Sequence, residues 1–273
     1  MKWLRRPSFL GVWSGVVFAY MFTPILVVVL FSFNGTLNAS GKWSQGRYNY
    51  RWDRFSFDPW ANIGQYPALT KAFQRSVLIA LTAVAISVVL GTLMSLALVK
   101  FRFTGKGFVN TLLVLPLTMP ELVLGFALLN LFASAGVRRG YLTIIIAHVM
   151  FCVSYITTTV KARIRGFDWR LEEAAADLGA TPLTTFRKIT LPLIAPGIAA
   201  AALLTFALSL DDFIITYFNS GRVETFPVRI WTQKRSSIPP QLNVFASLIL
   251  LVSLALSVGG LVLQTRRGRR ALF

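Results

Sequence analysis

Six long apolar stretches constrain this chain more than any other feature of its sequence. They cover residues 9–31, 77–99, 108–132, 141–160, 193–218 and 242–264. A helix rises 1.5 Å per residue, so about 20 apolar residues cross the hydrocarbon core of a bilayer. With 55% hydrophobic residues and a mean hydropathy of +0.63, the chain is too apolar for an ordinary soluble domain. The sequence predicts an all-α, polytopic protein with six transmembrane helices in one domain, residues 1–273.

The distribution of Lys and Arg predicts the orientation of these spans. Six spans place both termini on one side, and 16 of the 28 Lys and Arg residues lie in the two tails, the second loop and the fourth loop. Positive charge in short loops favours the cytoplasmic side, so both termini are predicted to be cytoplasmic. The formal net charge of +18 then fits loop topology and anionic lipid headgroups better than nucleic acid.

Residues 32–75 form the longest predicted outer segment. They are rich in Trp, Tyr, Asn and Gly and contain no long apolar run, which is typical of a folded cap or an interfacial segment. The segment is too short for a receptor domain. It carries the glycosylation pattern Asn-Ala-Ser at Asn38, which is short enough to arise by chance.

Two patterns inside the spans predict packing and no chemistry. Small residues recur every four positions on the second span, at Ala83, Ser87, Gly91 and Ser95, and such a ridge lets another helix approach closely. His148 and Cys152, the single residues of their kinds, lie in an apolar run. This pair cannot build a disulfide framework or a zinc site, so both are predicted to pack between helices.

The stretch EEAAADLGATPLTTFRKITLP, residues 172–192, is a polar island in the predicted cytoplasmic loop 161–192. Its pattern predicts a first short helix ending at Gly179, because Gly favours a left-handed C-terminal cap. A second helix should begin with Thr181 as its N-cap and Pro182 in its first position. Arg187 and Lys188 would then fall in its last turn.

The first of these helices is amphipathic, with Leu171, Ala174, Ala175 and Leu178 on one face. A small, flat apolar face outside the bilayer suits a groove on another protein. The same spacing equally suits a loop helix packed on its own bundle.

The island resembles the EAA loop of the membrane subunits of bacterial ABC importers, whose pattern is EAA, three residues, G, nine residues, I, one residue, LP. The matching residues are Glu173, Ala174, Ala175, Gly179, Ile189, Leu191 and Pro192. The resemblance implies the type I importer permease fold, a location in the bacterial inner membrane, and a coupling helix that sits in a cleft of a cytoplasmic ATPase. It also implies that these seven residues couple the ATPase to the spans.

The chain is not predicted to be an enzyme. A Walker A loop needs G-x-x-x-x-G-K-[ST], and the nearest stretch, FTGKG around Lys106, lacks the first Gly and the hydroxyl residue. No cofactor is therefore expected on this chain, and ATP with Mg²⁺ would be bound by a partner ATPase. By resemblance the other partners are a homologous second permease, a second ATPase subunit and an extracytoplasmic solute-binding protein.

Three acidic residues lie inside the predicted spans, namely Glu121, Asp211 and Asp212. A charged group at this depth costs roughly 3 kcal/mol unless it faces a cavity or a partner, so each is a candidate for the substrate pathway. Glu121 follows Pro116 and Pro120, which each remove a helix hydrogen bond. Broken helices at membrane depth line protein or water, as transport sites do.

Asp211 and Asp212 cannot both face one pathway, because adjacent helix positions diverge by about 100°. One of them could instead cap a loop or pair with an Arg of a neighbouring subunit. Carboxylates without fixed cations at the same depth favour a positively charged solute.

The solute is narrowed by a second resemblance. SLDDFIITYFNSG, FPVRIW, IPPQLNVFAS and MPELVLG look like the corresponding stretches of the spermidine/putrescine branch of these permeases. The implied function is polyamine import by alternating access. Alternatives are the same machine with ferric iron, a sugar or an anion as cargo, and an ion-coupled secondary transporter. A membrane enzyme is the weakest, since no nucleophile, base and orienting group occur together.

Overall fold

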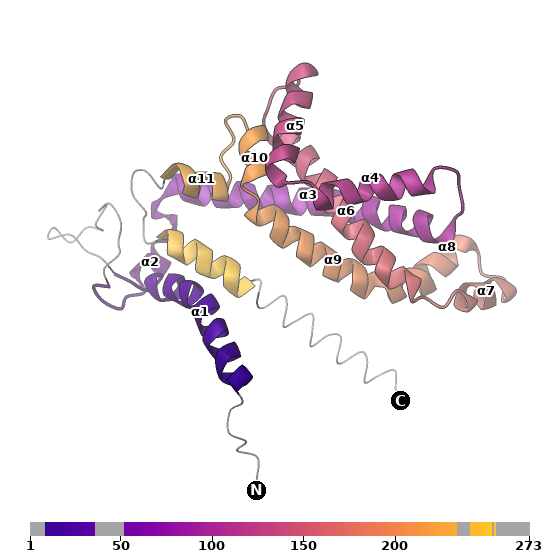
Figure 1. The fold of residues 1–273 in the computed structure, drawn as a ribbon, viewed down its shortest axis with the longest axis horizontal. Helices are drawn as coiled ribbons and strands as arrows, with labels where there is room; N and C mark the ends of the chain where they lie inside the picture. The colour runs from indigo at the N-terminus through magenta and orange to yellow at the C-terminus, as the bar shows by residue number, and fades with distance from the viewer. Residues whose placement is uncertain (1–8, 36–51, 234–240, 253, 255–273) are drawn as a thin grey trace, which may run out of the picture. The chain divides into compact units, whose positions relative to one another are not determined.

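The computed structural model describes residues 9–35, 52–233, 241–252 and 254. These residues form helices and one isolated bridge, between Asn34 and Phe55. The elements are α1 (Phe9–Phe31), α2 (Asp58–Ala61), η1 (Ile63–Gln65), α3 (Pro67–Lys100), α4 (Lys106–Thr118), α5 (Glu121–Ser134), α6 (Tyr141–Arg165), α7 (Arg170–Asp177), α8 (Pro182–Thr185), η2 (Phe186–Thr190), α9 (Leu191–Asp211), α10 (Ile214–Asn219) and α11 (Phe226–Gln233) (Figure 1). The predicted all-α class is confirmed.

Within the described residues, four helices are long and apolar enough to span a membrane: Leu10–Phe31, Pro67–Lys100, Tyr141–Arg165 and Pro182–Asp211. The pair α4 and α5 would make a fifth span, bent by 112° at its break. The predicted sixth span, residues 242–264, is described only in part, and Gln241–Val252 is an apolar helix. These helices agree with a multi-pass membrane protein.

The boundaries of two spans differ from the sequence prediction. Helix α3 begins at Pro67, well before residue 77, so part of the predicted outer segment is helical. The predicted continuous span 193–218 is two helices, because α9 ends at Asp211 and α10 begins at Ile214. The reason for this break lies in the side chain of Asp212, described below.

The described residues divide into two compact units, one within residues 1–71 and 230–255 and the other within residues 72–229. The first unit holds α1 and a cluster of stacked and edge-to-face aromatic rings, namely Phe33, Phe55, Phe57 and Trp60. The cluster and the Asn34–Phe55 bridge fold the described part of the predicted outer segment. Asn38 lies outside the described residues. That residues 1–273 form one transmembrane domain stays a prediction.

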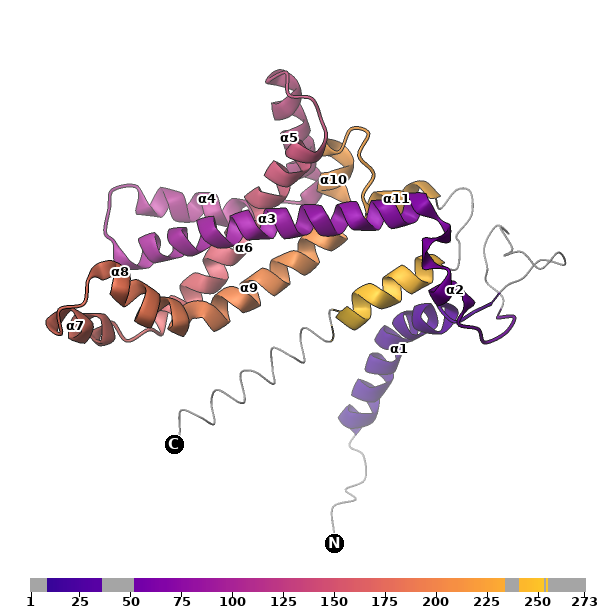
Figure 2. The same cartoon turned by 180° about the vertical axis from the view of Figure 1, so that it is seen from behind.

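The core of the second unit is built around α6, which runs beside α9 in both views (Figures 1 and 2). The predicted ridge of small residues on α3 packs against it. Ser95 Oγ donates to Thr157 O at 2.9 Å. A Cβ atom on Gly91 would lie 2.7 Å from Ile156 Cγ2, closer than carbon atoms pack. The two helices therefore approach at a distance that only small residues allow.

Substituting Gly91 tests this packing. G91A should lower the thermal midpoint of the protein in detergent, because overpacking in a close contact costs about 1–3 kcal/mol and outweighs the better helix propensity of Ala. G107A is the matched control, since nothing lies within 4 Å of a Cβ on that helical glycine. Equal midpoints for the two variants would contradict the close approach of α3 and α6.

Candidate functional site

The polar island, residues 172–192, folds as the sequence predicts around Gly179. Helix α7 ends in a Schellman motif, in which Ala180 N donates to Ala175 O and Gly179 N donates to Ala176 O, both at 2.9 Å. Gly179 has a φ of +81°, which residues with a Cβ rarely adopt. Thr181 then caps α8 by accepting a hydrogen bond from Thr184 N at 3.3 Å. Both predicted caps are confirmed.

The second helix of the island differs from the expected short helix. Its last predicted turn, with Arg187 and Lys188, does not end the helical backbone. The five residues of η2, Phe186–Thr190, form a π-helical turn that leads directly into α9. Pro192 lies in the first turn of α9 and has no N–H to donate. A π-helical turn is a common way to accommodate such an irregularity without ending the helix. The second half of the island is therefore continuous with the long apolar helix Pro182–Asp211.

The seven residues of the EAA-like pattern divide into an exposed and an internal group. Glu173, Ala174, Gly179 and Pro192 are exposed, Ile189 and Leu191 are half-buried, and Ala175 is buried at 8% exposure. The apolar face of α7 is only partly covered by the chain itself, since Leu178 is 89% exposed. The sequence left two interpretations of this helix, docking on another protein and packing on its own bundle. Of its predicted apolar face, the chain itself buries Ala175, while Leu171, Ala174 and Leu178 are exposed.

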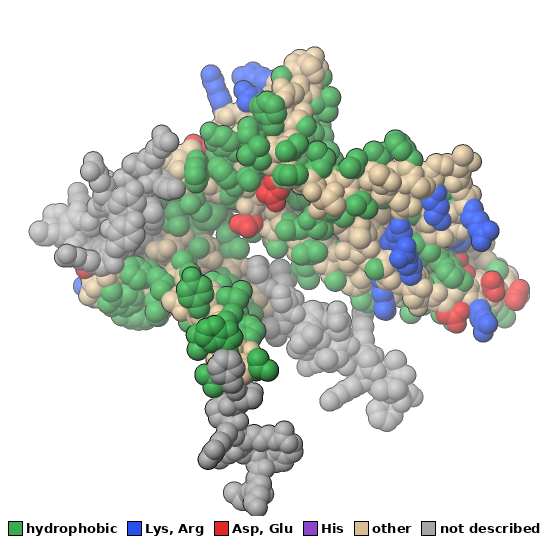
Figure 3. Space-filling view, viewed as in Figure 1, with side chains coloured by type: hydrophobic (Ala, Val, Ile, Leu, Met, Phe, Trp, Pro, Cys, Tyr) green, Lys and Arg blue, Asp and Glu red, His purple; other side chains and the backbone are tan. Residues whose placement is uncertain are grey.

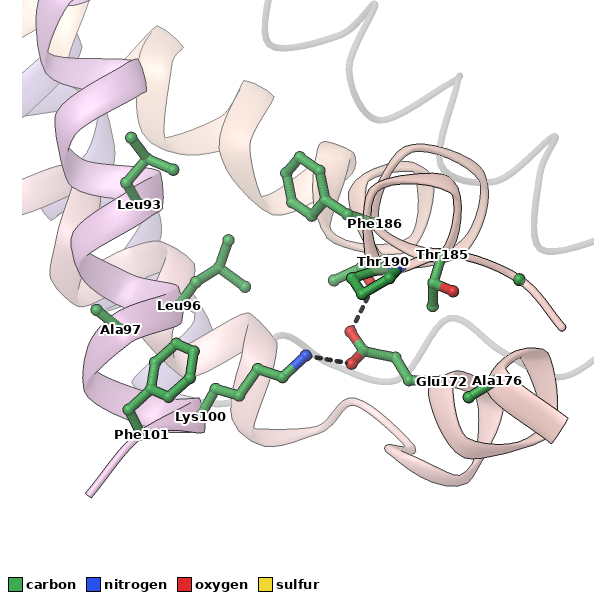
Figure 4. A pocket seen from close by; sticks show the side chains of 12 residues that line it. Leu93, Leu96, Ala97, Lys100, Phe101, Glu172, Ala176, Thr185, Phe186 and Thr190 are labelled. Atoms are coloured by element: carbon green, nitrogen blue, oxygen red, sulfur yellow. Dashed lines mark hydrogen bonds and ion pairs between the residues drawn. The ribbon is translucent and has the colours of Figure 1, made fainter.

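Glu172, which lies outside the EAA-like pattern, ties α7 to the rest of the second unit. Its carboxylate accepts a hydrogen bond from Lys100 Nζ at 2.5 Å and another from Thr190 Oγ1 at 2.6 Å (Figure 4). Lys100 ends α3 and its Nζ also lies 5.6 Å from the centre of the Trp169 ring. One side chain thus joins α7, α3 and the π-helical turn η2.

The electrostatics of Glu172 follow from these contacts. Burial raises the pKa of its carboxyl group. The hydrogen bonds from Lys100 and Thr190 and the charge of Lys100 lower the pKa by more than burial raises it, so the pKa lies below its usual range. The carboxylate is therefore ionised at neutral pH. Sequence reasoning missed this residue, although a Glu one position before the EAA-like pattern and a Lys at a helix end were both visible.

A cavity of about 440 Å³ lies beside this ion pair, between the end of α3 and the polar island. Its apolar lining includes Leu93, Leu96 and Phe186, and the Glu172–Lys100 pair lies between the elements that enclose it (Figure 4). The Glu172–Lys100 contact thus joins the island to α3 at the edge of a cavity.

The first of the intramembrane acids lies at a sharp bend. Helix α4 ends at Thr118 and α5 begins at Glu121, and the two helices differ in direction by 112°. Figure 2 shows α5 turned away from α4. Glu121 is exposed in the first turn of α5, where the helix dipole favours a negative charge. The predicted break of the helix before Glu121 is confirmed; it lies at Met119 and Pro120, and Pro116 is inside α4.

Asp211 and Asp212 have different environments. Asp211 ends α9 and is exposed. Asp212 has an extended backbone, with φ −61° and ψ 121°, and its side chain is only 5% exposed. Its Oδ2 accepts from Thr216 N at 2.8 Å and from Thr216 Oγ1 at 2.7 Å. Asp212 therefore caps the start of α10, which is why the predicted single span is broken there.

One apolar cluster lies next to both breaks. Its buried members come from α3, α5, α6 and α10: Val84, Leu124, Leu128, Phe132, Ala147, Phe151, Cys152 and Ile215. Met119, two residues before Glu121, and Leu208, three residues before Asp211, pack against this cluster. Helix α10 also contacts α5 closely, since Asn219 Nδ2 donates to Gly125 O at 3.2 Å. The structure thus brings the two acid-bearing breaks to one core.

His148 is a second residue that sequence reasoning left out of the site. It lies on α6 with 1% of its side chain exposed and contacts Ser209, Thr216 and Asp212. Cys152 is fully buried in the apolar cluster, as its predicted packing role requires. The sequence held one signal for this role of His148: it is a histidine inside a predicted span, at a depth comparable with that of Asp212 in another span.

Figure 3 shows where charged side chains lie on one face of the molecule. Lys and Arg gather near the α7 end of the second unit and near the tip of α5; acidic side chains lie beside the basic ones at the α7 end, and others lie among apolar side chains near the centre of the view. Carboxylates without neighbouring cations in an apolar surface attract a positive charge.

Comparison with known proteins agrees with this architecture. Residues 87–271 match the family model of the binding-protein-dependent transport system inner membrane component. The chain is 37% identical over 244 residues to a spermidine/putrescine transport system permease protein, PotC, of Haemophilus influenzae, covering 89% of this chain and 91% of that protein. It is also 37% identical over 243 residues to the putrescine transport system permease protein PotI of Escherichia coli, covering 85% and 82%.

Solved structures show the same fold. A bacterial ABC transporter involved in the import of the acidic polysaccharide alginate superposes with a TM-score of 0.64 at 15% identity, over 94% of each chain. An amino acid ABC transporter superposes with a TM-score of 0.58 at 18% identity, over 77% of this chain and 98% of that one. The family match covers more than half of the chain, and the named relatives are permease proteins. The chain is therefore a permease subunit that belongs to the family of binding-protein-dependent transport system inner membrane components.

Proposed function

We propose that this permease imports polyamines, with Glu121 and Asp211 on the path of the solute. The observation that carries the proposal is the pair of exposed carboxylates at two helix breaks around one apolar cluster. A polyamine carries several ammonium groups, which carboxylates in a partly dry site attract strongly. The likeness to permeases named for spermidine and putrescine supports the same solute.

The partners follow from the family and from the shape of the cytoplasmic island. The exposed face of α7, with Glu173 and Leu178, has the character of a helix that docks in a groove on another protein. We assign that groove to an ATPase, with ATP and Mg²⁺ bound there and no cofactor on this chain. A second permease, a second ATPase and an extracytoplasmic solute receptor complete the proposed importer. Both termini would lie on the cytoplasmic side of the bacterial inner membrane with α7.

The mechanism proposed is alternating access driven by the ATPases. Closure of the ATPases would move α7, and the continuous helix from Pro182 to Asp211 would carry this movement to the end of the span. Asp211 lies at that end, so the acidic site would change its accessibility with the position of α7.

The solute assignment is tested by uptake of labelled spermidine and putrescine into proteoliposomes that hold the complete importer and its receptor. E121Q and D211N should each lower uptake at least about tenfold, because each removes a charge contact worth about 1.4 kcal/mol or more in a partly dry site. The ATPase activity without solute should be unchanged. No uptake of either polyamine by the wild-type importer, with uptake of another solute, would overturn the assignment.

The docking role of α7 is tested by substituting its exposed residues. E173K and G179V should abolish most uptake while the permease remains inserted, because they alter the charge and the turn of the docking segment. G105V is the matched control for G179V, since Gly105 has a similar φ of +88° and both glycines have open space around a Cβ. Normal uptake in G179V, or an equal loss in G105V, would contradict the docking role.

The tie between Glu172 and Lys100 has a pH dependence with a definite sign. A folded-state pKa below the unfolded value means that the contribution to stability is fully present above about pH 4.3 and is lost as pH falls through the folded pKa. E172Q should therefore lower the free energy of unfolding at pH 7 by about 1 kcal/mol, given the exposure of Lys100. The difference from the wild type should shrink below pH 4.

Thermal unfolding in detergent at pH 7 and at low pH measures this difference. E173Q serves as the control, because Glu173 is exposed and its neutralisation should leave the midpoint unchanged. A difference between wild type and E172Q that is the same at both pH values would contradict the role of the charged carboxylate.

A further inference from the structure

A buried polar cluster joins three helices next to the acid-bearing break of α9 and α10. His148 on α6 lies 2.7 Å from Ser209 Oγ on α9 through Nδ1, and 2.9 Å from Thr216 Oγ1 on α10 through Nε2. The same Nε2 lies 3.3 Å from Asp212 Oδ2. His148 is therefore in contact with both sides of the break and with the residue that forms it.

The hydrogen bonds assign the proton on Nε2. Thr216 Oγ1 donates its only proton to Asp212 Oδ2 at 2.7 Å, so it can only accept from His148. Nε2 must then carry a hydrogen, which also points toward the carboxylate. Asp212 accepts from Thr216 N as well, and its side chain is 5% exposed. Its acceptor capacity is used inside the fold, which leaves little of it for a solute.

We propose that His148 is a positioning residue of the transport pathway, which acts by holding Asp212 as the cap of α10 and thereby fixing the exposed carboxylate of Asp211. Asp211 is the last residue of α9 and directly precedes the cap, so its backbone direction is set by the same bonds. Ser209, two residues earlier, is held by the other nitrogen of the same ring. The imidazole thus fixes the chain on both sides of Asp211.

The two adjacent acids therefore have different roles. Asp212 is structural, and Asp211 is the residue of the pair that meets the solute. Only the contact of Asp211 with a polyamine rests on the proposed function. The placement of position 211 by His148 is a property of the fold and can be measured without transport.

The chain suits a thiol-labelling test, because Cys152 is its single cysteine and is buried. In a C152A background, D211C is introduced into the complete importer in lipid nanodiscs, and its rate of modification by a small cationic thiol reagent is measured. H148F removes the polar contacts of the ring with Ser209, Thr216 and Asp212 and keeps an aromatic side chain. H148Q keeps a donor and an acceptor.

H148F should change the modification rate of D211C at least about threefold, because the reactivity of a thiol follows its exposure and surroundings. H148Q should remain within about a factor of two of the parent. S95A is the matched control, since it removes another buried hydrogen bond to α6, from Ser95 Oγ to Thr157 O, away from the break. It should leave the rate unchanged. If H148F does not assemble, T216V, which removes the bridging hydroxyl, takes its place with the same expectation.

Uptake then separates the two proposals. With Asp211 present, H148F should shift the ratio of spermidine to putrescine uptake at saturating receptor, whereas a loss of assembled protein would lower both equally. In a D211N background H148F should leave the ratio unchanged. A labelling rate that H148F and T216V leave unaltered overturns the positioning role. Failure of the wild-type importer to take up polyamines, with altered labelling, overturns the solute assignment and leaves the positioning role standing.

Discussion

Helix α6 is the element on which the second unit depends. Its buried positions run along its whole length, from Thr143 to Ile164, and helices α3, α4, α9 and α10 all pack against it. In lipid there is little hydrophobic drive between helices, so close packing and hydrogen bonds must hold them together. The glycine and serine ridge of α3 and the histidine of α6 supply these two kinds of contact.

The same requirement explains why polar groups gather where helices break. Each helix end leaves backbone N–H or C=O groups without partners, and inside a membrane no bulk water satisfies them. At α10 the carboxylate of Asp212 accepts from the free N–H groups, and at α5 Glu121 lies where the helix dipole favours it. An acid inside a span can therefore have a structural role, as Asp212 does by accepting hydrogen bonds at the start of α10. Its neighbour Asp211 does not make these bonds and is exposed.

The sequence predicted most of the fold because membrane spans leave a strong local signal. Turn chemistry at Gly179 and Thr181 and the broken helix before Glu121 were equally predictable, since each depends on residues close in the chain. The break at Asp212 was open to prediction only as one of several roles for that acid. Its cause is the local cap that Asp212 makes with Thr216, but the contact of His148 on α6 with this cap joins residues far apart in the chain and leaves no local pattern.

The candidate site was predictable to a similar degree. The acids and the EAA-like residues were found from residue type and spacing, which identify chemistry but not direction. Glu172 and His148 were missed because their importance comes from partners far along the chain, Lys100 for one and Ser209 for the other. A single sequence without aligned relatives gives no means of pairing such residues.

The π-helical turn between α8 and α9 has a mechanical consequence. Because the backbone passes through it without ending, residues Pro182–Asp211 act as one rod of 30 residues. At 1.5 Å per residue the rod is about 45 Å long, so a tilt of about 5° at one end displaces the other end by about 4 Å. A small rotation outside the membrane is thereby amplified into a displacement comparable with the width of an ammonium group, without any helix having to unwind.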